Sequence, residues 1–309
     1  MSAIFSCVLK MFFMCLEGAR SDIFNIVVNN GSRRSLVEYV QKRRHRNKRF
    51  SVIDIGAVAN PWSLHSGLAD AILDLFAWQV DYCFDGVQWK SMGPACCKAG
   101  SERNLEFCFD EYHTRERCCS NNKVRPPPLL FSGDIMHEDG WTDVLRYVEK
   151  AGRFDLAITS HILEDVMRPR LIIDMLPRVA KSGYVAVPSK YQELHRNSWS
   201  LDPGKMAPYR GSIHHFWIYT VKQNVLRGIP KLPFIEGDST LDPVGDLGGY
   251  ETRMSDLNFM WNGTLPFEVL NDGFMGPSVD AVVMMVRAAI GPEAYDDVDS
   301  VAGIKPIQA

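Results

Sequence analysis

The hydrophobic pattern predicts an alternation of short strands and helices over residues 50–190. Five apolar runs, each ending at a glycine, a proline or a polar residue, have the composition of buried strands. They span residues 50–56, 69–74, 128–134, 154–160 and 183–188. Residues 141–150 and 171–179 carry apolar side chains at helical spacing. Strands that alternate with helices are typical of an α/β fold with a doubly wound, mainly parallel sheet.

The rest of the chain departs from this alternation. Residues 78–128 are polar and hold six of the eight cysteines, so we interpret them as an insertion into the core. Three further apolar runs, at 216–221, 265–270 and 281–288, are expected to complete the sheet as strands, with antiparallel pairing possible at its edge. An acidic tail follows from residue 291.

The first 49 residues are expected to be helical and basic. Residues 33–49 contain eight lysines or arginines against the single acid Glu38, and Ser35 is a suitable N-cap for a helix whose cations gather at its C-terminal end. The plainer interpretation is a solvated helix end. The alternative is an electrostatic landing surface for a phosphate-bearing substrate, nucleic acid or anionic lipid.

Composition and charge narrow the class of protein. The 309 residues are 46% hydrophobic, and 34 basic against 37 acidic side chains give a net charge of -3. This composition disfavours a disordered chain and a nucleic-acid-binding protein driven by bulk positive charge. The apolar stretch at 3–16 is interrupted by Lys10, falls short of the roughly 20 residues of a transmembrane span and is a weak match to a secretory signal. We therefore expect a cytoplasmic protein without a transmembrane span.

Acidic residues close the first three predicted strands. Asp54-x-Gly56 ends the first, Asp74 the second and Asp134 the third. In doubly wound sheets the ligand binds outside the carboxyl ends of the strands, where a glycine lets the backbone approach a nucleoside and an acid can accept hydrogen bonds from both ribose hydroxyls. Three acids in this order predict a nucleoside-binding edge.

With these residues the chain resembles the class I S-adenosylmethionine-dependent methyltransferases. The similarity covers about residues 50–190, and its most specific part is the Phe-Asp, Ser-His-x-Leu-Glu pattern at 154–165 with the glycine at 183. The resemblance implies a Rossmann-like methyltransferase sheet and S-adenosylmethionine as cofactor. It specifies the fold and the cofactor far better than the acceptor.

The resemblance also implies roles for individual residues. Asp54 and Gly56 would shape the methionine end of the cofactor site, and Asp74 would hold the ribose. The adenine would lie against Asp134 and Ile135. Two further residues, Ser160 and His161, would line the pocket beneath the methyl donor.

Two positions depart from the family pattern. Val58 replaces the second glycine of the first motif, and Asp165 replaces a frequent histidine. A β-branched residue at position 58 crowds the site, so a catalytically silent homologue is an alternative. A Gly-x-Gly-x-x-Gly after the first strand and a phosphate-binding loop are both absent from the sequence, which disfavours a nicotinamide enzyme and a P-loop kinase or ATPase.

The candidate catalytic bases lie beyond the fifth strand. His214 and His215 stand in a segment, 209–217, that reaches over the reacting end of the cleft in such folds. Removal of the acceptor's proton by one of them would assist transfer to a hydroxyl. The alternative is a structural role for both. If Glu193, His195 and one of these histidines converged they would be able to hold a metal, which spacing alone leaves unknown.

The cysteine pattern allows three states of the insertion. No Cys-x-x-Cys pair is present in the sequence, so the zinc-knuckle signature is missing. Unpaired thiols in a cytosolic loop are the first expectation, with a structural zinc or disulfides as alternatives. We interpret the insertion as a substrate lid or a partner surface.

The resulting division of the chain has four parts. These are a basic helical segment (1–49), a cofactor-binding core (50–190) with its Cys-rich insertion (78–128), a C-terminal substrate-facing part (191–290) and a tail (291–309). The expected function is methylation of an oxygen or nitrogen on a small molecule or glycan. An RNA or protein methyltransferase using residues 33–49 is one alternative, with nucleic acid possible but not favoured as a partner. A catalytically silent binding or scaffold protein is the other.

Overall fold

The computed structural model describes most of the chain. The described residues are 26–28, 32–57, 62–77, 83, 92–98, 108–109, 113–120, 122–196, 209–248, 254–270, 278–302 and 304. Val58, at the departing motif position, lies outside them, as does the apolar stretch at 3–16.

A seven-stranded sheet organises the molecule, in the order β1-β11-β8-β7-β2-β3-β6. Five neighbouring strands are parallel: β6 (Leu129–Ser132), β3 (Ala71–Asp74), β2 (Val52–Ile55), β7 (Phe154–Ser160) and β8 (Ala180–Pro188). On β8 follow β11 (Asp256–Asn262) and then β1 (Ile26–Val28), each antiparallel to its neighbour. These five parallel strands are the five apolar runs of the sequence, so the predicted doubly wound, mainly parallel, Rossmann-like sheet is confirmed.

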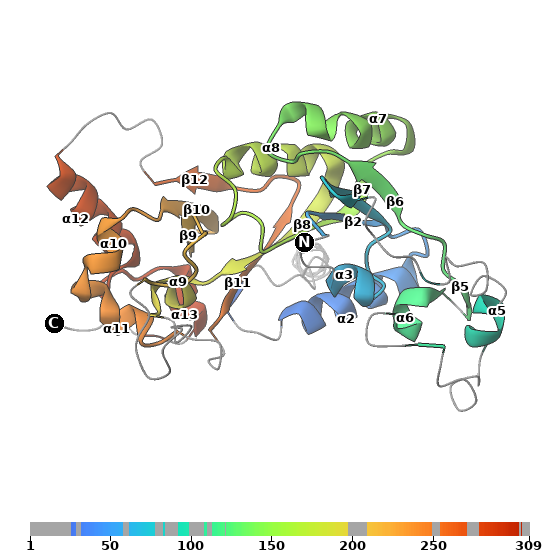
Figure 1. Ribbon diagram of the computed structural model, residues 1–309, viewed down its shortest axis with the longest axis horizontal. Coiled ribbons are helices and arrows are strands. Elements are labelled where there is room, and N and C mark those ends of the chain that lie inside the picture. The colour runs from blue at the N-terminus through green and yellow to red at the C-terminus, as the bar shows by residue number, and fades with distance from the viewer. Residues whose placement is uncertain are drawn as a thin grey trace, which may run out of the picture.

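Alternation along the strands divides the core into two layers. Ile53 and Ile55 face the helices α7 (Thr142–Ala151) and α8 (Pro169–Val179), whereas Val52 faces α2 (Ser32–Arg46). Figure 1 shows α7 and α8 on one side of the sheet and α2 with α3 (Trp62–His65) on the other. Helices on both faces explain why these strands are apolar throughout rather than alternating.

The C-terminal part forms a second, smaller sheet. Its order is β12-β10-β9, made of β9 (Trp217–Lys222), β10 (Val225–Pro230) and β12 (Phe267–Val269). Around it lie α9 (Lys190–Leu194), α10 (Phe234–Gly237), η4 (Ser239–Leu241), α11 (Asp242–Gly245), α12 (Val279–Ile290) and α13 (Asp297–Ala302).

The prediction that 216–221, 265–270 and 281–288 complete the main sheet is wrong. The first two runs are strands of the smaller sheet, and the third is helix α12, whose N-terminus is capped by the side chain of Ser278. A continuous apolar run of this length does not distinguish a strand from a buried helix. Strands β11 and β1 complete the main sheet instead.

The basic segment is a helix as predicted, but it begins at Ser32 rather than after Ser35. One of its cations serves the fold: Arg44 donates to the carbonyl oxygens of Gly67 and Leu68 at 3.0 and 2.6 Å and to the carboxylate of Asp70 at 2.6 Å. Arg125, from the far side of the insertion, also donates to Asp70, at 3.1 Å. These contacts tie α2 to the start of β3.

The cysteine-rich insertion contains three disulfides, not the free thiols we expected first. They join Cys83 to Cys118, Cys96 to Cys108 and Cys97 to Cys119. Its elements are α5 (Gly93–Cys96), α6 (Arg115–Cys118) and a two-stranded ribbon of β4 (Cys119–Ser120) and β5 (Lys123–Val124); η3 (Glu138–Trp141) follows β6. Figure 1 places them at the end of the molecule opposite α10, α11 and α12. Among the described residues, no helix has both the length and the apolar character needed to cross a bilayer.

Candidate functional site

Two carboxylates lie together at the edge where β2 and β3 end. Asp54 pairs in register with Ile72, and the amide of Gly56 donates to the carbonyl of Leu73 at 2.8 Å, which sets the end of β2 beside Asp74. Asp54 is 2% exposed and Asp74 is 8% exposed. The negative charge of Asp74 acts directly on Asp54.

Burial and this like charge perturb Asp54. Burial raises the pKa of its carboxyl to about 7, the Asp74 charge adds to the rise, and a hydrogen bond from the Ser63 hydroxyl and the charge of Arg33 oppose it. Asp54 is therefore about half ionised at neutral pH. A cationic ligand group beside it would shift this balance toward the carboxylate.

The third acid reaches the same edge. The amide of Gly133 donates to the carbonyl of Asp74 at 3.1 Å, so the turn that carries Asp134 follows directly beside the end of β3. Asp134 accepts a hydrogen bond from the amide of Met136 at 2.9 Å and keeps a third of its side chain exposed. Ile135, the next residue, packs partly buried against the core. The structure thus gathers the three strand-ending acids on one rim of the sheet.

Gly56 occupies a position that a side chain would disturb. Its φ is +79°, in the left-handed region, and a Cβ there would lie 2.6 Å from Cδ1 of Ile162. The absence of a side chain lets the turn after β2 pack against the segment that follows β7.

The end of β7 carries several buried polar atoms without a hydrogen-bond partner. Among the described residues these include the hydroxyls of Thr159 and Ser160, Nε2 of His161 and both carboxylate oxygens of Glu164. Unsatisfied buried polar groups are rare in native proteins and commonly mark the place of a ligand, an ion or water. This edge, continuous with the rim that bears Asp54, therefore has free hydrogen-bonding capacity.

His161 is held in an acidic setting. Its φ is +55°, and its Nδ1 and Nε2 lie 3.2 Å from Glu164 and 3.7 Å from Asp256. Burial lowers the pKa of His161, but the two carboxylates outweigh it and raise the pKa to about 9. The side chain is a cation at neutral pH. Asp256 comes from β11, which sequence analysis did not connect with the site.

The candidate bases lie near these residues. The ring of His215 is 10% exposed, with Nδ1 at 2.5 Å from Glu193 and Nε2 at 3.7 Å from Asp165; His214 is 67% exposed, with Nε2 at 3.6 Å from the same oxygen of Asp165. Burial lowers the pKa of His215, but the hydrogen bond with Glu193 and the negative charge of Glu193 outweigh burial, so the net pKa is raised.

The structure brings together some of the residues that the sequence offered as metal ligands. Glu193 and His215 are in contact, but His195 places Nδ1 at 2.9 Å from the carbonyl oxygen of Gly245 in α11. Within the described residues, the three groups that approach one another like metal ligands are Asp165, His214 and His215. His195, which the sequence left as a conditional member of a metal site, does not belong to this group.

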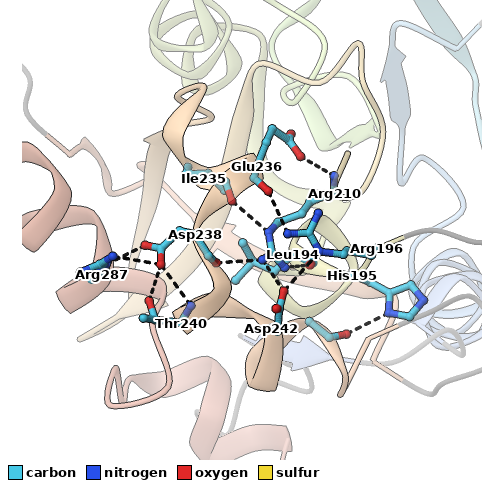
Figure 2. A network of polar contacts seen from close by, with 11 residues as sticks. Leu194, His195, Arg196, Arg210, Ile235, Glu236, Asp238, Thr240, Asp242 and Arg287 are labelled. Atoms are coloured by element: carbon cyan, nitrogen blue, oxygen red, sulfur yellow. Dashed lines mark hydrogen bonds and ion pairs between the residues drawn. The ribbon is translucent and has the colours of Figure 1, made fainter. Parts of the chain in front are cut away.

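A buried arginine anchors the segment that carries the two histidines. Arg210 is fully buried, and Figure 2 shows its guanidinium surrounded by oxygen atoms. It donates at 2.5–2.9 Å to the carbonyl oxygens of Leu194, Ile235 and Asp238 and to the carboxylate of Asp242. Next to it, Gly211 has a φ of +54° and approaches Glu193 so closely that a Cβ would lie 2.6 Å from its carboxylate. These contacts fix residues 210–215 against α9.

Sequence analysis missed one cation of the site. Arg33, read only as part of a basic helix, lies with its guanidinium 5.4 Å from the ring centre of Trp62 and acts electrostatically on Asp54. Its Nε is buried without a hydrogen-bond partner. No local signal marks this role, because α2 meets the end of β2 only in the folded chain.

Comparisons with known proteins reveal a distant likeness of fold. No family model and no curated protein match the chain. Among solved structures, the methyltransferase domain of bacterial CtHen1 is similar over 74% of this chain and 97% of its own (13% identity, TM-score 0.30). The N-terminal domain of EvdMO1 with SAH bound is similar over 73% of this chain and 80% of its own (13% identity, TM-score 0.26). A cyclopropane-fatty-acyl-phospholipid synthase-like protein from Lactobacillus casei ATCC 334 is similar over 77% of this chain and 96% of its own (10% identity, TM-score 0.28).

The order and direction of the strands define the class. Five parallel strands with an antiparallel strand beside the last of them, and helices on both faces, form a doubly wound, Rossmann-like α/β fold. The sequence motifs on these strands resemble those of the class I S-adenosylmethionine-dependent methyltransferases.

Proposed function

We propose that the protein is an S-adenosylmethionine-dependent methyltransferase that acts on an oxygen or nitrogen of a small molecule or glycan. The observation that carries the proposal is the gathering of Asp54, Asp74 and Asp134 on one rim, at the ends of three adjacent parallel strands. Ligands of doubly wound sheets bind at this edge.

The residues on the rim fit the parts of the cofactor. The carboxylate of Asp74 would accept hydrogen bonds from both ribose hydroxyls, and Asp134 with the amide of Ile135 would form hydrogen bonds with the adenine. At the methionine end the site offers both signs of charge, since Arg33 would pair with the carboxylate and Asp54 with the ammonium group. The buried Ser160 hydroxyl and the Arg33 Nε, both without partners, are polar atoms that a ligand would satisfy.

The bound cofactor would supply an activated methyl group on a sulfonium. The transfer is an in-line displacement, so the protein's work is to align the acceptor, exclude water and remove the acceptor's proton. The segment 210–216 and the end of β7 lie where such an acceptor would be held. His161, Glu164 and Asp165 provide hydrogen-bonding and charged groups there.

A small-molecule or glycan acceptor is favoured over RNA because the basic helix is partly committed to the fold. Arg44 is bound to Gly67, Leu68 and Asp70, and Arg43 donates to the hydroxyl of Tyr39 at 3.0 Å. The alternative is tested with Arg46→Gln combined with Lys48→Gln, which leaves these contacts intact. Salt-sensitive RNA binding that the double variant weakens would favour an RNA substrate.

The three disulfides of the insertion bear on the cellular compartment in which the protein folds. Three of them in one short insertion favour an oxidising environment over the cytoplasm we expected, because thiols are kept reduced in the cytosol. Thiol titration of the protein isolated without reductant, before and after unfolding, measures how many cysteines are free. Six reactive thiols within the insertion would favour the cytoplasmic alternative.

Calorimetric titration with S-adenosylhomocysteine tests the proposed function. We expect saturable binding to the unmodified chain, loss of that binding in Asp74→Ala, and normal binding in the matched control Asp143→Ala, whose carboxylate is exposed on α7. Absence of heat at high micromolar ligand would instead support a catalytically silent scaffold protein. Unchanged S-adenosylhomocysteine binding in Asp74→Ala would contradict the assignment of the rim as the cofactor site.

A further inference from the structure

Three side chains beside the proposed acceptor site are arranged like the ligands of a metal ion. One ligand atom each from Asp165, His214 and His215 lies within 4.8 Å of the others. Nε2 of His214 and Nε2 of His215 are 3.6 and 3.7 Å from the same oxygen of Asp165. The two imidazole rings stand edge to face, at an interplanar angle of 80°.

A buried carboxylate supports one of these histidines from behind. Glu193 is 1% exposed, and its Oε1 lies 2.5 Å from Nδ1 of His215. The other oxygen of Glu193 lies 3.2 Å from the ammonium group of Lys231. Histidines that bind metals almost always donate their second ring nitrogen to a carboxylate or carbonyl, which fixes the ring and leaves the other nitrogen for the metal. His215 has this arrangement, with Nε2 toward Asp165.

The adjacent Glu164 provides a second, independent observation. Its side chain is 1% exposed, and neither carboxylate oxygen accepts a well-formed hydrogen bond, although Nδ1 of His161 lies 3.2 Å from one of them. Its charge acts on His215. The cationic His161 offsets part of the cost of burying this carboxylate, and a metal ion beside His215 would offset more of it. With Asp165 and Glu193, three carboxylates therefore surround the two histidines.

We propose that Asp165, His214 and His215 bind a divalent transition metal ion, with Zn²⁺ as the ion that this donor set suits best. Ligand atoms about 2.0–2.1 Å from a tetrahedral zinc lie about 3.3 Å apart. The separations of 3.6 and 3.7 Å between the histidine nitrogens and Asp165 need to contract by only a few tenths of an ångström to reach this value. Two imidazole nitrogens and one carboxylate oxygen are donors that zinc accepts readily. Three protein ligands leave the fourth position open for water or a substrate oxygen.

None of the three proposed metal ligands is a residue assigned to the cofactor, and the relation of the metal site to catalysis rests on the proposed function. An ion in this position would bind an acceptor hydroxyl and lower its pKa, so that the hydroxyl would release its proton to solvent water rather than to a histidine base. This assigns a hydroxyl, rather than an amine, as the acceptor. His214 and His215 then act as ligands, and Glu193 as a positioning residue.

Metal binding is measured on the untagged full chain after chelation, without cofactor. We expect one Zn²⁺ per chain by calorimetry, and Co²⁺ substitution should produce the visible absorption of a tetrahedral site. His214→Ala should weaken Zn²⁺ binding at least tenfold; this side chain is two-thirds exposed, so its loss leaves the fold intact. Asp165→Asn should weaken it comparably. His45→Ala, an exposed histidine on α2, is the matched control and should bind Zn²⁺ normally.

Two results would overturn the inference. One is the absence of stoichiometric Zn²⁺ binding to the unmodified chain, and the other is unchanged affinity in both His214→Ala and Asp165→Asn. Titration with S-adenosylhomocysteine separates this inference from the proposed function. Zinc binding without S-adenosylhomocysteine binding would support the metal site and contradict the proposed methyltransferase function. S-adenosylhomocysteine binding without zinc binding would contradict the metal site alone.

Discussion

Substitution of Asp54 by asparagine should stabilise the protein in a pH-dependent manner. The carboxyl is buried, and burial together with Asp74 raises its pKa from 3.8 to about 7. Between these two values the folded chain retains a proton that the unfolded chain has released, so the free energy of unfolding falls as the pH rises. About three pH units at 1.36 kcal/mol each correspond to a total loss of about 4 kcal/mol.

Asp54→Asn removes this pH dependence, since an amide is neutral throughout. Its oxygen is still able to accept the hydrogen bond from Ser63. Relative to the unmodified protein, the free energy of unfolding of the variant should increase by about 2–3 kcal/mol between pH 5 and pH 8. Urea denaturation followed by circular dichroism at several pH values measures this change. The same variant should lose affinity for S-adenosylhomocysteine, because the ammonium group loses its anionic partner.

The matched control is Asp155→Asn. Burial raises the pKa of Asp155, but the hydrogen bonds from Lys181 and Ser51 outweigh it and the net pKa is lowered. The contribution of the ionised Asp155 to the free energy of unfolding is present above the pKa of the unfolded chain and is lost only in acid. The difference in free energy of unfolding between Asp155→Asn and the unmodified protein should therefore be constant between pH 5 and pH 8. A constant difference for Asp54→Asn as well would refute the reasoning, because it would mean that Asp54 is already ionised at pH 5.

Three further predictions follow from local geometry. Replacing Cys83 and Cys118 by serine opens a crosslink between residues 35 positions apart and should lower the free energy of unfolding by about 3–4 kcal/mol, measured by urea denaturation without reductant. Gly56→Ala should lower the free energy of unfolding by about 1–3 kcal/mol and weaken S-adenosylhomocysteine binding. Adding Ile162→Ala removes the clash with the new Cβ but should recover only part of the stability, because the positive φ remains. Full recovery would contradict the backbone explanation. Arg210→Met should cost about 3 kcal/mol or more and weaken Zn²⁺ binding in the folded fraction, and unchanged zinc affinity would show that Arg210 does not position the histidines.

The local pattern was enough for the strands that bear the cofactor residues. Strands β2, β3 and β6 are short apolar runs, and acids at the ends of neighbouring parallel strands necessarily meet on one edge of the sheet. This is why the rim of Asp54, Asp74 and Asp134 was predictable. Helix α12 was not, because its apolar run resembles a buried strand and only the packing around it selects the helix.

Long-range partners were beyond the reach of the local pattern. Strand β11 pairs with β8 although about 70 residues separate them, and it supplies Asp256 to the setting of His161. The pairing of the six insertion cysteines depends likewise on which sulfur atoms the folded loop brings together. Adjacent cysteines such as Cys96 and Cys97 bond to different partners, which spacing alone does not reveal.

The sequence by itself determined the mainly parallel sheet, the apolar runs that form its strands and the acids that end them, because these follow from hydrophobic periodicity and from the position of each residue in its strand. Only the tertiary structure decided how the charges around the site are paired. Arg33 acts electrostatically on Asp54, Glu193 contacts His215, and His214 lies 3.6 Å from Asp165, and in each case the two residues come from separate elements. The protonation of such groups depends on burial and on charges a few ångströms away, and the packing of the whole chain sets both.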